Sequence, residues 1–324
     1  MLFGVIGVGV HGNSFLLGEL VKVNFDGSIG KFLFVAFFIA FAIKAPMVPV
    51  HTWLPDAAEQ ATPGASTLLV GLLDKIGTLG MIRICLGLFP QASQWATPFV
   101  LVLAVVSVIW GATMAVTSKD LMRLVSYTSV SHFGFMIIGI FAVTTTSLTG
   151  SIFYMFNHGF STAALFLVLG FLVKRRGSAQ VDAFGGVQKT APVLAGMFLF
   201  AGLATMSLPG ISNFIGEFMV LAGAWSRHPV YVAVATLGMV LGAVYILLTY
   251  KRTMTGPLTQ ATKEHVTTDL TGLEKAALTP LVILLLVFGF FPRPMLHVIE
   301  PVAHQTMSIV GVTDPAPAAE EGVK

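Results

Sequence analysis

Residues 41–83 read FAIKAPMVPVHTWLPDAAEQATPGASTLLVGLLDKIGTLGMIR and decide the fold. Two apolar runs flank a proline-rich segment, and each run contains a lysine, Lys44 and Lys75. A charged side chain near the centre of a bilayer costs roughly 2.5 kcal/mol or more, and proline cannot continue a regular helix because it lacks an N–H donor. Non-helical backbone at membrane depth persists only where protein or water satisfies its polar groups. The stretch therefore predicts a broken membrane span beside a buried polar path.

The composition of the 324-residue chain is typical of a membrane protein. Hydrophobic residues make up 55% and charged residues 10%, whereas soluble domains contain about 25% charged residues. Apolar runs of roughly 20 residues recur without alternation, which predicts an all-α polytopic membrane protein rather than a β-barrel. The basic residues are scattered through short loops, so the net charge of +3 does not indicate a nucleic-acid partner. Cys85 stands alone in an apolar run, which predicts neither a disulfide nor a metal site.

The apolar runs predict about eight transmembrane helices. The run 192–225 is longer than one span needs and has Leu208-Pro209-Gly210 at its middle, which predicts a second broken span. Outside the spans we expect a helix remnant at 1–9 followed by a loop to residue 30, a polar loop at 252–274, and a disordered tail at 312–324. The predicted spans are 31–47, 64–88, 96–117, 121–144, 149–174, 192–225, 229–251 and 275–292.

Loop charge predicts the orientation, because Lys and Arg are enriched in cytoplasmic loops. The side reached after the first full span holds ten basic residues and the opposite side holds five. This count places the loop 252–274 in the cytoplasm and the C-terminus outside. The ten are Lys119, Arg123, Lys174, Arg175, Arg176, Lys189, Lys251, Arg252, Lys263 and Lys275, and the five are Lys22, Lys31, Arg227, Arg293 and Lys324.

A few ionisable residues remain at membrane depth once the loops are set aside. Scattered structural ion pairs would give such a pattern, but so would a proton relay, which needs groups that gain and lose protons with water and hydroxyls between them. The residues are Lys44, Asp74, Lys75, Arg83, His132, His158 and Glu217.

Several of these residues also have a structural interpretation. Lys44 is close to a helix end, where it can extend to the interface, and Arg83 is placed as an anchor. Asp74 need not pair with Lys75, because adjacent helical residues point about 100° apart. Two further residues of the proline-rich segment, His51 and Trp53, are expected to be structural residues of the interface.

The two histidines and the glutamate are the other candidates. His132 follows a hydroxyl-rich stripe that includes Ser131, which serves either helix packing or proton transfer. His158 lies near the middle of the next span, and two histidines on consecutive helices favour the relay over lone hydrogen-bonding groups. Glu217 follows the Pro209-Gly210 break, as Lys44 precedes the first break.

Four segments carry a resemblance to a known family. The stretch from Lys44 to Arg83, and then RLVSYTSVSHFGF, FNHGFSTAALF and LPGISNFIGEFMVL, are similar in order and spacing to the antiporter-like membrane subunits of respiratory complex I, NADH:quinone oxidoreductase. The resemblance covers about residues 30–310. The glutamate of NFIGEF is similar to that of the M-type subunits, since the related L- and N-type subunits usually have a lysine there.

The resemblance implies a fold of 14 transmembrane helices with two inverted five-helix repeats, each containing one discontinuous helix. In this chain, residues 31–90 would be the end of the first repeat, 96–251 the second repeat, and 275–311 the last helix and a following segment. The implied proton relay consists of Lys44, Lys75, His132, His158 and Glu217, with Asp74, Arg83 and Ser131 as secondary candidates. Quinone reduction would change the proton affinity of the lysines and drive protons outward.

The chain departs from the family before Lys44. The family has some six further helices there, including one with a glutamate that pairs with this lysine. We therefore expect an N-terminally truncated chain in which Lys44 is an unpaired buried charge, and we find no role for Asp74 in the resemblance.

The resemblance also implies a cellular setting. No dinucleotide-binding glycine motif or cysteine cluster is present, so NADH, FMN, iron–sulfur clusters and quinone are expected to bind to partner subunits and no cofactor to this chain. The implied partners are the lipid of a bacterial plasma membrane and the L-, N-, K-, H-, J- and A-type membrane subunits. Two alternatives stay open: a subunit of a multi-subunit Na⁺/H⁺ antiporter, and a non-functional remnant.

Overall fold

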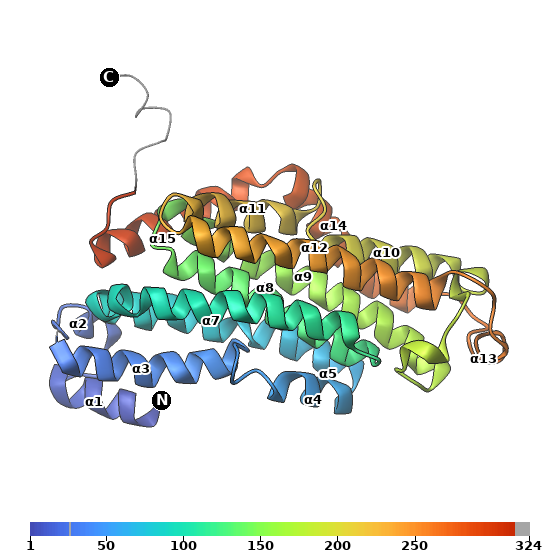
Figure 1. Ribbon diagram of the computed structural model, residues 1–324, viewed down its shortest axis with the longest axis horizontal. Helices are drawn as coiled ribbons and strands as arrows, with labels where there is room; N and C mark the ends of the chain where they lie inside the picture. Colours follow the sequence, from blue (N-terminus) through green and yellow to red (C-terminus); the bar gives the residue numbers. More distant parts are fainter. Residues whose placement is uncertain (26, 315–324) are drawn as a thin grey trace, which may run out of the picture.

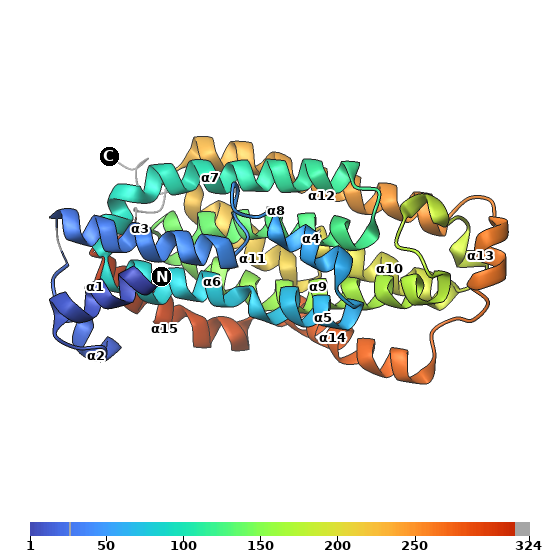
Figure 2. The same cartoon turned by 90° about the horizontal axis from the view of Figure 1, so that it is seen from below.

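The computed structural model describes residues 1–25 and 27–314, and this part of the chain is helical throughout. The long helices run side by side along the long axis of an elongated bundle (Figures 1 and 2). The elements are α1 (Leu2–Gly12), α2 (Leu17–Leu20), α3 (Gly27–Lys44), α4 (Trp53–Gln60), α5 (Pro63–Leu68), η1 (Leu69–Leu73), α6 (Lys75–Gly80), η2 (Met81–Leu86), α7 (Pro90–Thr117), α8 (Leu121–Phe141), α9 (Thr145–Arg176), η3 (Val181–Ala183), η4 (Val187–Lys189), α10 (Pro192–Thr205), α11 (Ser212–Trp225), α12 (Pro229–Met254), α13 (Gln260–His265), α14 (Gly272–Phe290) and α15 (Arg293–Val310).

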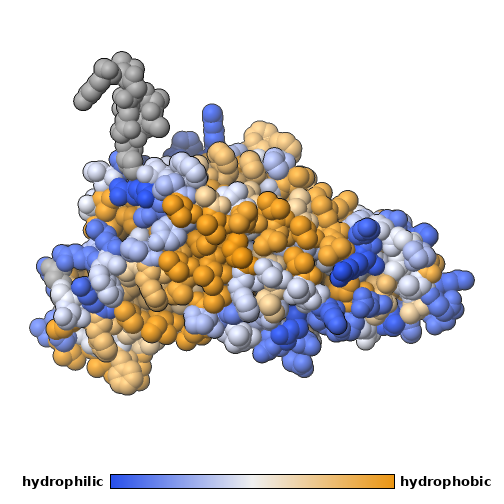
Figure 3. All heavy atoms as spheres, in the orientation of Figure 1, coloured by the Kyte–Doolittle hydropathy of each residue, from blue (hydrophilic) through white to orange (hydrophobic). Residues whose placement is uncertain are grey.

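Membrane-spanning helices account for most of the bundle. Within the described residues, α3, α7, α8, α9, α12 and α14 are each long and apolar enough to cross a membrane. The surface is also typical of a membrane protein. On the face shown in Figure 3, hydrophobic side chains form a broad band across the middle and hydrophilic ones gather towards the ends. The remaining predicted spans, 64–88 and 192–225, are interrupted helices.

The central helix is α8, whose most apolar window is completely buried. It packs against α4, α7, α9 and α11. A membrane helix surrounded on all sides by protein can carry polar side chains, because they meet other protein groups rather than lipid. The hydroxyl-rich sequence of α8 therefore lies inside the bundle and not on its lipid-facing surface.

Both predicted helix breaks are present. The first separates α3 from α4 across residues 45–52, where Pro46 and Pro49 stand. The second separates α10 from α11 across residues 206–211, where Ser207 and Gly210 have φ of 57° and 96°. A left-handed backbone is uncommon for a serine. In Ser207 it accompanies a hydrogen bond from the side-chain hydroxyl to Glu217.

The predicted span 64–88 has an internal structure that the sequence did not indicate. It consists of four consecutive helical segments, in which the π-helical turns η1 and η2 flank the short α-helix α6. A π turn holds one more residue than an α turn and so rotates the residues that follow it relative to a regular helix. Lys75 is the first residue of α6, and Asp74 alone stands between it and the first of these turns.

One predicted loop is wrong. The expected loop at 10–30 contains the end of α1, the whole of α2 and the beginning of α3. The segment after the last span is an 18-residue helix, α15, which packs along α9 and reaches the first turn of α7, where the Gln94 side chain donates to the Val310 carbonyl at 2.7 Å. Of the predicted disordered tail, residues 315–324 lie outside the described part, whereas Asp314 accepts a hydrogen bond from the Thr145 N–H at 2.8 Å.

Ion pairs fasten the end of the bundle where α9 stops and α14 begins. Arg175 and Glu274 form two hydrogen bonds of 2.9 and 2.6 Å, with only 10% and 16% of their side chains exposed. At the same end, one guanidinium nitrogen of Arg123 lies 2.7 Å from carboxylate oxygens of both Asp56 and Glu59, so α8 is joined to α4. These contacts use residues from the basic side predicted to be cytoplasmic.

Candidate functional site

The first broken span places Lys44 beside the next helix. Lys44 is the last residue of α3, and its Nζ lies 3.7 Å from Oδ1 of Asp74, whose side chain is completely buried. The same ammonium group lies 5.6 Å from the centre of the Trp53 ring. The expectation of an unpaired Lys44 is therefore wrong, and the aspartate for which the resemblance offered no role is its partner.

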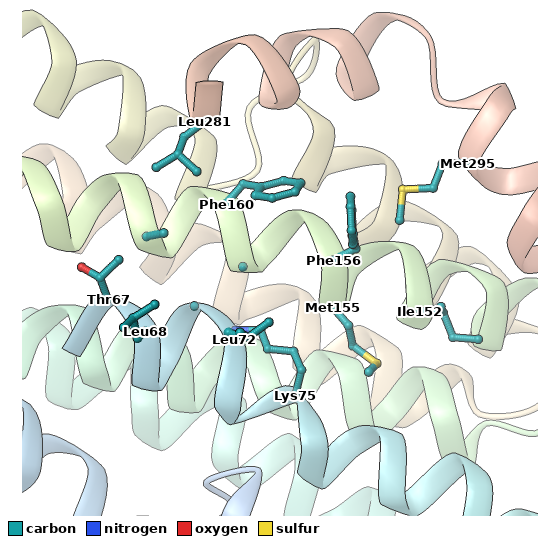
Figure 4. A pocket seen from close by; sticks show the side chains of 13 residues that line it. Thr67, Leu68, Leu72, Lys75, Ile152, Met155, Phe156, Phe160, Leu281 and Met295 are labelled. Carbon is teal, nitrogen blue, oxygen red and sulfur yellow. The ribbon is translucent and has the colours of Figure 1, made fainter. Parts of the chain in front are cut away.

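Lys75 points towards the centre of the bundle. Its Nζ donates to the Val70 carbonyl and lies 5.3 Å from the centre of the Phe133 ring on α8. It also forms part of the wall of an apolar cavity of about 520 Å³ between the 63–80 segment, α9 and the α14–α15 junction (Figure 4). Phe156 and Phe160 line the same cavity from α9. Lys75 thus lies where the first part of the chain meets the second.

The two histidines form a buried pair. His132 on α8 and His158 on α9 have ring centroids 5.1 Å apart. The Phe133 ring, which Lys75 contacts, has its centroid 5.7 Å from that of His158. Nε2 of His132 lies 3.1 Å from the Tyr245 hydroxyl, and Nε2 of His158 lies 3.1 Å from the Thr162 hydroxyl. In both residues, Nδ1 has no hydrogen-bond partner among the described residues.

Glu217 lies next to the histidine pair, on the side of the second break. It lies on α11 just beyond the second break, with 3% of its surface exposed, and accepts hydrogen bonds from Tyr154 at 3.2 Å and from Ser207. The left-handed backbone of Ser207 therefore serves to direct its hydroxyl at the carboxylate. Tyr154 also stacks on His132, with centroids 5.8 Å apart, so it touches both the histidine pair and the glutamate.

The close approach of α9 and α11 depends on a glycine. A Cβ added to Gly216 would lie 2.7–2.9 Å from Cβ, Cα and N of Tyr154. Only a residue without a side chain fits there, because such contacts are shorter than van der Waals distances. Gly216 precedes Glu217, so the same contact that brings the helices together sets the carboxylate beside the Tyr154 hydroxyl.

A small cavity lies next to this group. Its volume of about 10 Å³ is close to what one water molecule needs, and polar side chains surround it. Four of them are Ser131, His132, Glu217 and Tyr245. Ser131 itself donates to the Val108 carbonyl at 2.9 Å, which ties α8 to α7.

The other residues singled out from the sequence lie apart from this centre. Arg83 is exposed on η2 and faces a groove shared with α15. His51 is buried in the first break, where its Nε2 lies 3.1 Å from the indole nitrogen of Trp110. The Trp53 indole N–H donates to the Ile43 carbonyl at 2.8 Å, which bridges the break.

Sequence reasoning missed three members of the site. Tyr154 lies one helical turn before His158, and residues at this spacing share a helix face, so this residue could have been found. Ser207 stands inside the predicted break but has no charge to attract notice. Tyr245 is part of the apolar helix α12 and has no signal in the sequence, because its role depends on the packing of α12 against α8.

The arrangement joins titratable and hydroxyl groups from five helical segments into one series. It runs from Lys44 and Asp74 to Lys75, then through His158, His132 and Tyr154 to Glu217. Groups of this kind exchange protons directly or through single water molecules. The described residues contain no cluster of three or more His, Cys, Asp or Glu side chains arranged to hold a metal ion.

Comparison with known proteins assigns the family. Residues 1–242 match the family described as NADH:quinone oxidoreductase/Mrp antiporter, transmembrane. The chain belongs to this family.

Individual members of the NADH:quinone oxidoreductase/Mrp antiporter family are similar over most of the chain. NADH-quinone oxidoreductase subunit M of Mycobacterium tuberculosis is 49% identical over 298 residues, which are 92% of this chain and 54% of that protein. The protein of the same name from Rickettsia prowazekii is 41% identical over 268 residues, 83% of this chain and 54% of that protein. The chain thus spans about half the length of the curated relatives it matches.

Solved structures of family members have the same fold. A chain of respiratory complex I from Thermus thermophilus with bound NADH superimposes with a TM-score of 0.88 at 31% identity, covering 96% of this chain and 66% of that one. A chain of the Mrp complex from a Dietzia species gives a TM-score of 0.84 at 21% identity, with 95% of this chain and 66% of that chain covered. The second likeness concerns the fold alone.

Proposed function

We propose that the chain is part of a proton-translocating membrane subunit of NADH:quinone oxidoreductase, and that it moves protons along the buried series from Lys44 to Glu217. The observation that supports this most strongly is the continuity of the series. His158, His132, Tyr154 and Glu217 follow one another in contact, and Lys75 is linked to His158 by the Phe133 ring, which both of them contact. Asp74, His132, His158, Tyr154 and Glu217 are buried, whereas the Lys44 side chain is 35% exposed and Lys75 borders the apolar cavity.

The contacts suggest how a proton would travel. Lys75 and His158 contact the same Phe133 ring and not each other, so transfer between them requires a bridging water molecule. The His132 and His158 rings are in contact, and their unpartnered Nδ1 atoms are available to such a water molecule. From His132 the Tyr154 and Tyr245 hydroxyls lead to Glu217 and to the small cavity beside it. Glu217 is the group that would release the proton from the buried series.

The broken helices have a defined part in this mechanism. Each break frees backbone groups from the helix and puts a charged or hydroxyl side chain at its edge, Lys44 at the first and Ser207 at the second. Discontinuous helices at membrane depth are typical of the binding sites of transporters. We infer that small movements at the breaks alter the contacts of Lys44 and Glu217 and so change their proton affinity.

The complex would supply what the chain does not. We propose that NADH, FMN, iron–sulfur clusters and quinone bind to partner subunits and that this chain binds no cofactor. The partners we propose are the L-, N-, K-, H-, J- and A-type membrane subunits, in a bacterial plasma membrane. The basic end of the bundle, with Arg123 and Arg175, would face the cytoplasm and the C-terminus the outside.

An antiporter subunit of the Mrp type is the second candidate, because the family includes both kinds of protein. The greater identity to relatives named subunit M, 49% against 21% for the Mrp structure, favours the oxidoreductase. The two functions differ in their driving force. Proton movement by an oxidoreductase subunit requires electron transfer from NADH, whereas an antiporter moves protons when a sodium gradient alone is imposed.

The test is proton pumping by membranes that contain the whole complex with Lys75→Ala or Glu217→Gln in this chain. Both variants are expected to assemble and to lose NADH-driven pumping. Lys251→Ala, an exposed lysine at the end of α12, is the control and should pump normally. Normal pumping by the Lys75 or the Glu217 variant would show that the series does not carry protons, and pumping driven by sodium alone would assign the chain to the antiporters.

A further inference from the structure

Asp74 has an unusual environment for a charged group. Its side chain is completely buried, and neither carboxylate oxygen has a hydrogen-bond partner among the described residues. Among the described residues, Asp74 forms an ion pair with Lys44, whose Nζ lies 3.7 Å from Oδ1 of the aspartate. A buried carboxylate normally has hydrogen bonds to all its lone pairs, because taking the charge out of water costs several kcal/mol. Asp74 lacks them.

Two features of the backbone hold Asp74 close to the first break. Gly77, one turn after Asp74, lies against α3 so closely that an added Cβ would be 2.5 Å from the Ala45 backbone nitrogen. The Asp74 N–H donates to the Leu69 carbonyl five residues earlier at 3.1 Å, which is the hydrogen bond of a π turn. The close approach and the π turn together point the Asp74 carboxylate at the end of α3.

Asp74 and Lys75 face different neighbours. Successive helical residues point about 100° apart, and the structure follows this rule: Asp74 faces Lys44 on α3, whereas Lys75 faces Phe133 on α8. The two adjacent residues therefore connect the first broken span with the helix that carries the histidine pair. Asp74 and Lys75 therefore lie between Lys44 and the centre of the bundle.

We propose that Asp74 is a proton-carrying residue that accepts a proton from Lys44 and passes it towards Lys75. The proposal rests on the proposed function. An N–H bond of the Lys44 ammonium breaks and an O–H bond forms on Asp74, which leaves a neutral amine and a neutral carboxyl group. The carboxyl group then gives its proton, through a bridging water molecule, to the neutral amine of Lys75, its neighbour along the chain.

The geometry favours this role over that of a static structural ion pair. A static pair stabilises a protein only when its geometry is good and its other lone pairs are satisfied, and the 3.7 Å separation and the unpartnered oxygens meet neither condition. Transfer of one proton removes both charges at once, so the pair can alternate between an ionic and a neutral form, with Asp74 buried and Lys44 35% exposed.

The first test compares Asp74→Asn with Asp74→Glu in the whole membrane complex. The asparagine keeps the shape but cannot carry a proton, so NADH-driven pumping is expected to fall at least tenfold, while the glutamate variant should keep at least half of the parent rate. Asp182→Asn, an exposed carboxylate in η3, is the matched control and should pump normally. Normal pumping by Asp74→Asn would overturn the proposal.

A second measurement covers the case in which the asparagine variant does not assemble. Infrared difference spectra recorded during turnover should contain the carbonyl band of a protonated carboxyl group that is shifted in Asp74→Glu, a signal that a purely structural ion pair would not give. A spectrum that is identical in the parent and the glutamate variant would overturn the proposal. Lys75→Ala separates the two proposals: if it abolishes pumping while Asp74→Asn pumps normally, the proposed function stands and only the role of Asp74 falls.

Discussion

The Tyr154 hydroxyl donates a hydrogen bond of 3.2 Å to Oε2 of Glu217 while its ring stacks on His132. One side chain of α9 therefore contacts both α11, which follows the second break, and α8, the central helix of the bundle. The tyrosine is completely buried and is held by the contact of its backbone with Gly216. The orientation of the carboxylate thus depends on helix packing as much as on the residues that exchange protons.

Removing only the Tyr154 hydroxyl should slow proton pumping. In Tyr154→Phe the ring and its packing remain, but Glu217 loses a hydrogen bond worth about 1.5 kcal/mol to a charged acceptor, which corresponds to roughly a tenfold lower rate. NADH-driven pumping and complex abundance are measured together. The control is Tyr250→Phe, whose ring packs on Phe198 away from the site. Equal rates in the two variants would mean that the hydroxyl takes no part.

A methyl group at position 216 should separate α9 from α11. Gly216→Ala places a carbon within 2.9 Å of three Tyr154 atoms, two of them backbone, so the helices must move apart. Overpacking of this kind costs about 1–3 kcal/mol and should lower both the thermal stability and the pumping rate. Gly196→Ala, on α10 with no atom within 4 Å of the new Cβ, should leave both unchanged or slightly raise stability. If the two variants behave alike, the contact does not limit the packing.

The pair Arg175–Glu274 should contribute strongly to stability. A hydrogen bond between charged groups contributes about 1.5–3 kcal/mol to stability, and this half-buried pair has two of them. Arg175 also donates to the carbonyls of Thr268 and Asp269, so it holds the chain before α14 in place. Arg175→Ala should therefore lower the midpoint of thermal unfolding in detergent, and Lys263→Ala, exposed on α13, serves as the control. A shift no larger than that of the control would contradict this prediction.

The stability of the chain should depend on pH through His228. Burial, and to a smaller extent the neighbouring Arg227, lower its pKa from the ordinary value of 6.5. The unfolded chain therefore binds a proton at this residue more readily than the folded one, so stability is lost as the pH falls through about 6.5 and is fully present above it. His228→Gln should flatten the dependence of the unfolding midpoint on pH, whereas His304→Gln, exposed on α15, should not. An unchanged pH profile in the first variant would refute the assignment.

Much of the fold follows from the sequence because its strongest signals are local. Pro46 and Pro49 mark the first break and Leu208-Pro209-Gly210 the second, and both breaks are present where they were predicted. The apolar runs identify the spans for the same reason, since each must be long enough to cross the bilayer. The π turns around Lys75 have no comparable signal: neither contains a proline, and their hydrogen bonds depend on the packing of neighbouring helices.

The site was predictable only where it carries charge. Lys44, Lys75, His132, His158 and Glu217 stand out because charged or titratable residues are costly inside a membrane. That all five fall along one series is a property of the tertiary structure, and their role in proton transfer stays a prediction. Tyr245 and the partnership of Asp74 with Lys44 could not be predicted, because they depend on contacts between α8 and α12 and between α3 and α6.

The complete enclosure of α8 has a practical consequence for chemical mapping of the chain. A photoreactive probe dissolved in the lipid can modify only side chains that meet the acyl chains, and within this chain none of the most apolar window of Leu121–Phe141 does. Peptides from α7, α12 and α14, which present exposed apolar side chains, should carry the label. A digest analysed by mass spectrometry should therefore contain an unlabelled interval in the middle of the protein, although this interval is itself apolar enough to cross a membrane.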